Sequence, residues 1–131
     1  MTRFAYIRRD GRCVLRADGH ADFCPGRDIV CAGASALMCA LAGALDALGA
    51  QGVQRTLCAG YAAIAADDRA DVRAAFTVAV TGLRQLAAAY PGHVAEDTGR
   101  APAQDEPNGS TAAGCCPAAV PGSGQQRKKE T

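Results

Sequence analysis

The sequence predicts a small two-layer α+β domain with the element order ββαββα, in which a sheet packs with two amphipathic helices. Two observations support this prediction. Short segments of β-compatible residues are separated by turn residues, and two long segments repeat apolar residues every three or four positions, the period of one helix face. The chain of 131 residues is long enough for one such domain. It is too short for a TIM barrel or a full dinucleotide-binding fold.

The large apolar residues are concentrated in the first part of the chain. Of the Val, Ile, Leu, Met, Phe and Tyr residues, only Val120 lies beyond Val94. Residues 1–95 are therefore expected to form the folded domain. Residues 96–131 are rich in Gly, Pro and Ala and are predicted to be a disordered tail without chemistry of its own.

The first two elements are predicted to form a β-hairpin. Phe4–Arg9 and Cys13–Asp18 have β-compatible character, and Asp10-Gly11 lies between them. An Asp-Gly step closes hairpins because both residues accept positive φ angles. We therefore expect two neighbouring antiparallel strands at the N-terminus.

Residues 29–48 are expected to form the first helix, which ends at the glycines 49 and 52. Its apolar stripe consists of Val30, Ala34, Leu37, Leu41, Leu45 and Leu48. Residues 29–45 carry no charge, so a membrane span is an alternative, although a span needs about 20 predominantly apolar residues and this stretch is mostly small. A small-residue helix buried against a sheet, or at a subunit contact, explains the same composition.

The second half of the domain repeats the pattern of strands followed by a helix. Val53–Ala66 alternates weakly and is interrupted by Gly60, which predicts two short strands. A second helix is expected from Asp68, capped by Asp67 or Asp68 and stopped at Pro91-Gly92. Its apolar stripe consists of Val72, Phe76, Val80, Leu83, Leu86 and Tyr90.

Charge and cysteine content restrict the partners and the compartment. The 14 basic and 13 acidic residues leave a net charge of +1, and in residues 1–95 the two signs are interspersed, which argues against direct binding of nucleic acid. The N-terminus lacks the apolar segment of a secretory signal, so we expect a cytoplasmic protein whose seven cysteines are thiols. Cys13, Cys39 and Cys58 fall within predicted elements and are expected to be core thiols.

The segment at the start of the first helix has the character of a catalytic site. If Asp28 is the N-cap, Cys31 lies in the first turn, where unpaired backbone N–H groups and the helix dipole favour thiolate over thiol. His20 follows a predicted strand, and the intervening loop can bring its imidazole to Cys31 as proton acceptor and donor. The amides of the first turn can then serve as an oxyanion hole.

Two other interpretations of these residues remain open. A Cys in an alanine-rich helix is often a small buried hydrophobe, and a single His after a strand is often a surface or core residue. Cys13, His20, Cys24 and Cys31 are four possible metal ligands, but their spacing lacks the paired C-x2-4-C of structural zinc sites. We therefore predict no metal and no cofactor.

Three motifs in this chain resemble a known family. They are GHA at residues 19–21, DIVCA-x-x-SAL at residues 28–37, and GLRQLAAAYPGHV at residues 82–94. Their order and spacing are similar to those of the bacterial ribosomal-processing cysteine proteases, the Prp family. The resemblance covers residues 3 to about 95 and leaves out the tail.

The resemblance implies a small α+β fold, a homodimer, and a Cys-His endopeptidase that removes the N-terminal extension of a large-subunit ribosomal protein. By motif, Cys31 is the nucleophile, His20 is the general base and acid, and Asp28 and Ser35 are supporting residues. From the residues themselves we expect no cofactor, no direct nucleic-acid partner and no membrane association. The alternatives are a non-catalytic ribosome-associated binding module of the same fold and, third, a metal or redox thiol protein.

The loop between the first two motifs departs from the family pattern. It reads DFCPGR, and its Cys24 suggests a reversible disulfide with Cys31 under oxidation. Peptide mapping after mild peroxide treatment tests this hypothesis, and the absence of a Cys24–Cys31 crosslink would exclude it.

Overall fold

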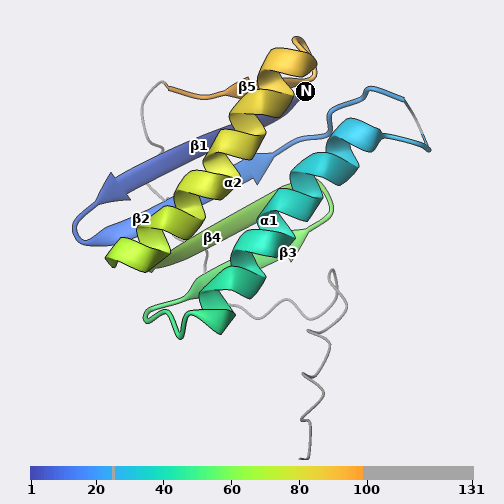
Figure 1. Ribbon diagram of the computed structural model, residues 1–131. Coiled ribbons are helices and arrows are strands. Elements are labelled where there is room, and N and C mark those ends of the chain that lie inside the picture. Colours follow the sequence, from blue (N-terminus) through green and yellow to red (C-terminus); the bar gives the residue numbers. More distant parts are fainter. Residues whose placement is uncertain (25, 99–131) are drawn as a thin grey trace, which may run out of the picture.

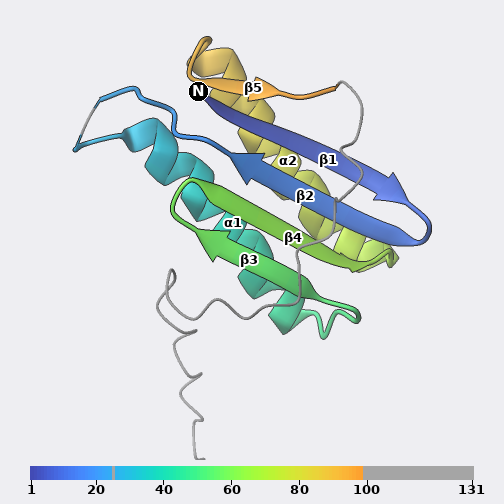
Figure 2. The ribbon, with the colours of Figure 1, turned by 180° about the vertical axis from the view of Figure 1, so that it is seen from behind.

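The computed structural model describes residues 1–24 and 26–98, in which two helices cover one face of a five-stranded sheet (Figures 1 and 2). Most of the predicted tail, residues 99–131, lies outside the described residues. The elements in chain order are β1 (Thr2–Arg9), β2 (Arg12–Asp18), α1 (Ile29–Ala47), β3 (Gln54–Cys58), β4 (Tyr61–Asp67), α2 (Ala70–Ala89) and β5 (Val94–Glu96).

The sheet has the strand order β3-β4-β2-β1-β5. The pairs β1/β2, β2/β4 and β3/β4 are antiparallel, whereas β5 runs parallel to β1 with Val94 opposite Thr2. The predicted α+β fold and its order ββαββα are confirmed, with β5 as an additional strand at the end. Three residues are too few to show a period of two, so this strand becomes visible only through its pairing with β1.

The N-terminal hairpin is the predicted one. Asp10 and Gly11 have φ angles of 53° and 73°, as a two-residue type I′ turn requires. Tyr6 lies opposite Leu15 in the resulting register, and Phe4 lies opposite Ala17. This register directs Phe4, Leu15 and Ala17 into the core between the sheet and the helices.

The core lies between the sheet and the apolar faces of the two helices. The buried residues of α1 are Val30, Ala34, Met38, Leu41, Ala42 and Leu45, and those of α2 are Val72, Phe76, Ala79, Val80 and Leu83. Both predicted stripes are therefore largely confirmed, with Met38 rather than Leu37 fully buried in α1. Cys39 is exposed, so its prediction as a core thiol was wrong, because it follows Met38 and points away from the sheet.

Helix α1 is long and apolar enough to cross a membrane by length and composition, with a mean hydropathy of 1.8. The core helix of a soluble protein can have the same length and hydropathy. In this structure Val30 and Leu45 of α1 have no exposed surface, and the helix lies against the sheet beside α2 (Figure 1). The arrangement agrees with the expected small-residue helix buried against a sheet.

Helix α2 begins differently from the prediction. Its N-cap is Arg69, which makes no capping side-chain hydrogen bond. Asp68, one of the two predicted caps, accepts hydrogen bonds from Arg8 Nε and Arg73 Nε at 2.8 and 2.9 Å. The other, Asp67, pairs with the guanidinium of Arg12. The prediction of an aspartate cap was therefore wrong, because arginines from other parts of the fold engage both carboxylates.

The two helices approach each other at two glycines. A Cβ atom on Gly82 of α2 would lie 2.6 Å from a Cδ atom of Leu37 on α1. In the reciprocal contact, a Cβ atom on Gly33 of α1 would lie 3.5 Å from both Cδ atoms of Leu86 on α2. Each helix therefore inserts a leucine against a glycine of its partner, and the first of these contacts is the tighter.

Candidate active site

The predicted catalytic histidine follows a glycine that is held tightly by its neighbours. Gly19 has a φ angle of 88°, and a Cβ atom there would collide with the carbonyl oxygen of Met1. Its N–H donates to the carbonyl of Gly60 at 2.9 Å. Ala21, on the other side of the histidine, is 1% exposed. The GHA motif therefore combines a glycine that the backbone requires with a buried alanine.

His20 itself is exposed and lies over the turn between β3 and β4. A Cβ atom on Gly60 would lie 2.9 Å from His20 Nε2, and Gly60 has a φ angle of 74°. Glycine at this position therefore gives both the turn and the space for the imidazole. Sequence reasoning identified Gly60 as a break between strands but did not assign it to the site.

Asp28 caps helix α1 as predicted. Its Oδ1 accepts from the N–H of Cys31 at 2.8 Å, and its Oδ2 accepts from the N–H of Phe23 at 3.1 Å. The hydrogen bond from the Cys31 amide, assisted by that from Phe23, lowers the pKa of the Asp28 carboxyl below its usual value. Cys31 is therefore the third residue of the helix, at its positively polarised end.

The cap changes the expected role of the first-turn amides. The N–H of Cys31 donates to the Asp28 side chain, and the N–H of Ala32 donates to the Asp28 carbonyl at 3.0 Å. Both amides are thus already bonded. These two amides are therefore not free to bind an oxyanion in this conformation, and the expected oxyanion hole stays a prediction.

Cys31 is half-buried at a pocket between the start of α1 and one end of the sheet. The cavity has a volume of about 60 Å³. Its lining includes Ala34, Ser35 and Met38 from α1 and Cys58, Gly60, Tyr61 and Ala62 from the β3–β4 hairpin. Ser35, one turn after Cys31, therefore lies on the same helix face, as predicted.

The structure brings the predicted site residues to one end of the fold but does not join His20 and Cys31, the two that are predicted to be catalytic. Cys31 and Ser35 line the pocket, and His20 lies over Gly60, which lines it too. Within the described part of the chain, no hydrogen bond connects His20 with Cys31. Catalytic hydrogen bonds are often long in free enzymes and tighten when substrate binds.

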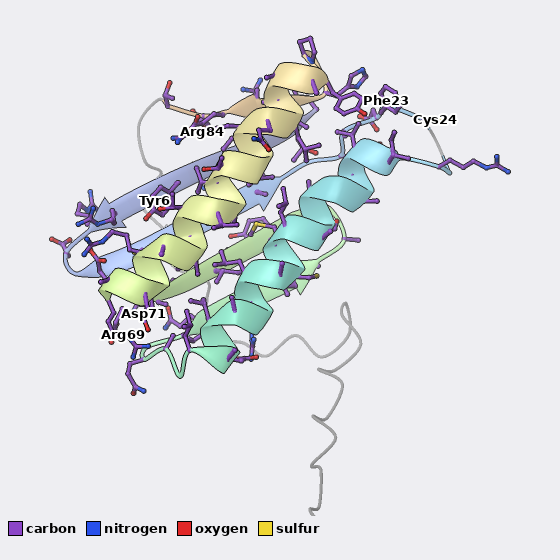
Figure 3. The ribbon with its side chains drawn as sticks, in the orientation of Figure 1. Tyr6, Phe23, Cys24, Arg69, Asp71 and Arg84 are labelled. Carbon is purple, nitrogen blue, oxygen red and sulfur yellow. The ribbon has the colours of Figure 1, made fainter. Side chains whose placement is uncertain are left out.

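The loop between His20 and Cys31 contacts the C-terminal end of α2. The ring of Phe23 packs edge-on against Tyr90 and His93, with centroid distances of 5.2 and 5.3 Å. Cys24, the next residue, is exposed and is a free thiol (Figure 3). Its disulfide with Cys31 stays a prediction. The aromatic cluster was missed from the sequence, where His93 was visible only as part of the third motif.

The four cysteine and histidine residues considered as metal ligands do not form a cluster. In residues 1–24 and 26–98, no group of three or more His, Cys, Asp or Glu side chains has the geometry to hold a metal ion.

Cys13 is buried in the core, where the hydroxyl of Tyr6 donates to its sulfur at 3.7 Å. Burial raises the pKa of Tyr6 to about 12. Cys13 is thus the core thiol that was expected.

Comparison with solved structures supports the fold. The chain is similar to the essential ribosomal processing protease Prp of S. aureus with a covalently linked product peptide, at 23% identity and a TM-score of 0.66 over 74% of this chain and 98% of that one. It is also similar to a Streptococcus mutans protein, at 28% identity and a TM-score of 0.59 over 74% and 92% of the two chains.

Comparison of sequences identifies the family. Curated proteins give no match. A family model described as cysteine protease Prp matches residues 1–95, which is most of the chain and includes every residue of the predicted site. The chain is therefore a cysteine protease and belongs to the Prp family.

Proposed function

We propose that this protease acts in the cytoplasm and removes the N-terminal extension of a large-subunit ribosomal protein, with Cys31 as nucleophile and His20 as general base and acid. One observation carries the proposal: Cys31 lies at the capped start of α1 on a pocket that also includes Gly60, the residue beneath His20. The similar S. aureus protein is a ribosomal processing protease whose structures hold a substrate peptide and a covalently linked product peptide. These complexes support the substrate class.

In the proposed reaction, the imidazole of His20 takes the proton of the Cys31 thiol. The sulfur attacks the scissile carbonyl carbon, and the bond to the leaving nitrogen breaks as His20 returns the proton to that nitrogen. Water then attacks the thioester, His20 takes its proton, and the Cys31 thiol is restored as the carboxylate product leaves. Because the two side chains are not hydrogen-bonded in the free protein, this reaction requires the His20 imidazole to approach the Cys31 sulfur when substrate binds.

Asp28 and Ser35 have supporting roles in this proposal. Asp28 holds the first turn of α1 through the amide of Cys31 and so sets the direction of the nucleophile. Ser35 lines the pocket one helical turn further on, where its hydroxyl can bond a peptide.

The test is cleavage of the full-length ribosomal protein encoded in the same genome, followed by intact-mass measurement. We expect wild type to shorten its N-terminus, Cys31→Ala and Cys31→Ser to leave it intact, and His20→Ala to slow cleavage by roughly 10²- to 10⁴-fold. Cys39→Ala is the matched control, since this cysteine lies on the same helix, exposed and outside the pocket lining, and should cleave like wild type.

Three results would contradict the proposal in different ways. If Cys31→Ala still cleaves the ribosomal protein, Cys31 is not the nucleophile. Binding of the ribosomal protein without cleavage by any form removes the processing role and favours a binding function. If the ribosomal protein encoded in the same genome has no N-terminal extension, the assigned substrate is wrong, even if the roles of His20 and Cys31 are right.

We further propose that the protein is a homodimer. The face of α1 turned away from the core presents small, uncharged residues at exposed positions, among them Ala32, Ala36, Cys39, Ala40 and Gly43. Such a surface permits close contact between two copies of a helix, and an interface of this kind would be symmetric. The N-terminal end of the same helix carries Cys31.

A further inference from the structure

His93 makes a hydrogen bond to the residue that follows the predicted general base. Its Nδ1 lies 2.8 Å from the carbonyl oxygen of Ala21, which is 72 positions earlier in the chain. A carbonyl oxygen only accepts hydrogen bonds, so Nδ1 must carry the hydrogen. The tautomer of His93 is therefore determined by Ala21, and the bond persists whether the imidazole is neutral or charged.

The turn that carries His93 is itself well anchored. The N–H of His93 donates to the carbonyl of Tyr90 at 3.1 Å, and its carbonyl accepts from the N–H of Thr2 on β1 at 2.9 Å. Just beyond, Arg84 of α2 binds both carboxylate oxygens of Glu96 on β5 at 2.7 and 2.8 Å. The imidazole thus extends toward Ala21 from a support that is fixed to the sheet and to α2.

A second contact joins the same turn to the loop. Phe23 is 41% exposed, yet its ring is held edge-on by Tyr90 and His93 at interplanar angles of 73° and 84°. Figure 3 shows Phe23 close to the C-terminal end of α2 and away from the sheet. Edge-to-face aromatic pairs of this geometry add stabilisation beyond the burial of area.

The loop is therefore held at two points, both of which lie between His20 and Cys31 in the chain. Near His20, the carbonyl of Ala21 is bound by His93. Near Cys31, the N–H of Phe23 is bound by the Asp28 carboxylate that also binds the Cys31 amide. The backbone of Ala21 is thus the link between His93 and His20.

We propose that His93 is a positioning residue for His20: its Nδ1–H holds the Ala21 carbonyl and so sets the backbone from which the His20 imidazole reaches Cys31. The inference rests on the proposed role of His20 as general base. The His93 side chain does not line the pocket, so its effect on His20 acts through the Ala21 carbonyl and the backbone that joins Ala21 to His20. The backbone carbonyl of His93 accepts from Thr2, which does line the pocket. Small misplacements of a catalytic group cost up to about 100-fold in rate.

A pair of substitutions with the same shape isolates the hydrogen bond. In His93→Asn, the side-chain nitrogen occupies nearly the place of Nδ1 and can still donate to Ala21. His93→Leu has the same shape and no donor, and both variants lose the aromatic ring. With the ribosomal protein as substrate, we expect His93→Leu to lower kcat on the order of 10- to 100-fold at nearly unchanged KM, and His93→Asn to restore most of it.

The control is Arg84→Ala, which removes the ion pair to Glu96 at the same end of the fold without touching Ala21. It should retain the kcat of wild type, although its Tm falls by a similar amount to that of His93→Leu. If His93→Leu does not fold, His93→Phe provides the comparison with His93→Asn, because it retains a ring and still lacks the donor.

The inference is overturned if His93→Leu, or His93→Phe in its place, has the kcat of wild type, or if His93→Asn loses as much activity as the variant without a donor. It is also overturned if Arg84→Ala lowers kcat equally at matched Tm, since the effect is then general loosening of this end of the fold. If the proposed role of His20 is itself wrong, the result is different, because His20→Ala would then cleave the ribosomal protein like wild type.

Discussion

At the residue scale, Asp28 is the group on which the candidate site depends most. Its two carboxylate oxygens bind the amide of Cys31 and the amide of Phe23, and thereby join the nucleophile to the loop that carries His20. This part of the site could be predicted because a cap and the third residue of its helix are separated by a spacing that the sequence displays. The aromatic partners of the loop could not, because they lie far away in the chain.

The lowered pKa of Asp28 predicts an acid-dependent contribution to stability. A carboxyl with a depressed pKa in the folded state stabilises the fold above its unfolded pKa of about 3.9 and loses this contribution as the pH falls through the folded value. Asp28→Asn retains a capping oxygen but does not titrate. We therefore expect wild type to have the higher Tm at pH 6 and the difference to shrink as the pH falls below about 4.

Thermal unfolding followed by circular dichroism between pH 3 and pH 7 measures this difference. Asp10→Asn, in the exposed turn between β1 and β2, is the control and should change Tm little across the range. A difference between wild type and Asp28→Asn that grows toward acid pH would contradict the predicted sign.

At the element scale, the helices and the two hairpins agree with the sequence pattern, whereas their contacts do not follow from it. The stripe in α2 is buried as expected. The expected caps of this helix, Asp68 and Asp67, instead bind arginines of β1 and β2, and β5 forms by pairing with β1. The close approach of α1 and α2 at Gly82 also depends on a residue of the other helix, Leu37.

The two interhelical glycines predict opposite responses to alanine. Gly33→Ala gains about 0.8–1 kcal/mol of helix propensity and meets Leu86 at ordinary van der Waals distance, so the free energy of unfolding should rise. Gly82→Ala has the same gain but forces Leu37 aside, and overpacking costs about 1–3 kcal/mol. We expect a net loss of about 1 kcal/mol for Gly82→Ala.

Urea unfolding of both variants checks this prediction. Leu37→Ala should lose less stability in the Gly82→Ala background than in wild type, because the new methyl group occupies space that Leu37 vacates. Additive effects of the two substitutions would contradict the proposed contact between these side chains.

At the scale of the whole molecule, α1 has a buried face and an exposed face that are both apolar. Its buried third contacts the sheet, while the exposed positions are mostly small residues. A helix that is apolar all round is expected to be covered on both sides. This composition is the basis of the proposed homodimer.

The dimer predicts a mass of twice 13.3 kDa at micromolar concentration in sedimentation or light scattering. Ala36→Arg places a charge on the exposed face of α1, and twofold symmetry introduces it twice, so dissociation should become at least about tenfold easier. Ala74→Arg, on an exposed position of α2, is the matched control and should leave the mass unchanged. A wild-type protein that stays monomeric at these concentrations contradicts the proposal.

The sequence by itself determined the features that depend on residues a few positions apart. The helix stripes, the Asp10-Gly11 turn, and the spacing that places Asp28, Cys31 and Ser35 on the first turns of α1 all belong to this class. Backbone geometry and hydrogen bonding within one helix or turn suffice to produce them.

Only the tertiary structure decided which distant residues meet. It placed His20 over Gly60, joined His93 to Ala21 across 72 positions, and bound the Asp68 carboxylate to Arg8 across 60. These contacts arise because the sheet brings the ends of β2 and β4 together, and because β5 returns beside β1. Such pairings depend on how the sheet and the helices assemble around the core, and local sequence patterns contain no record of that assembly.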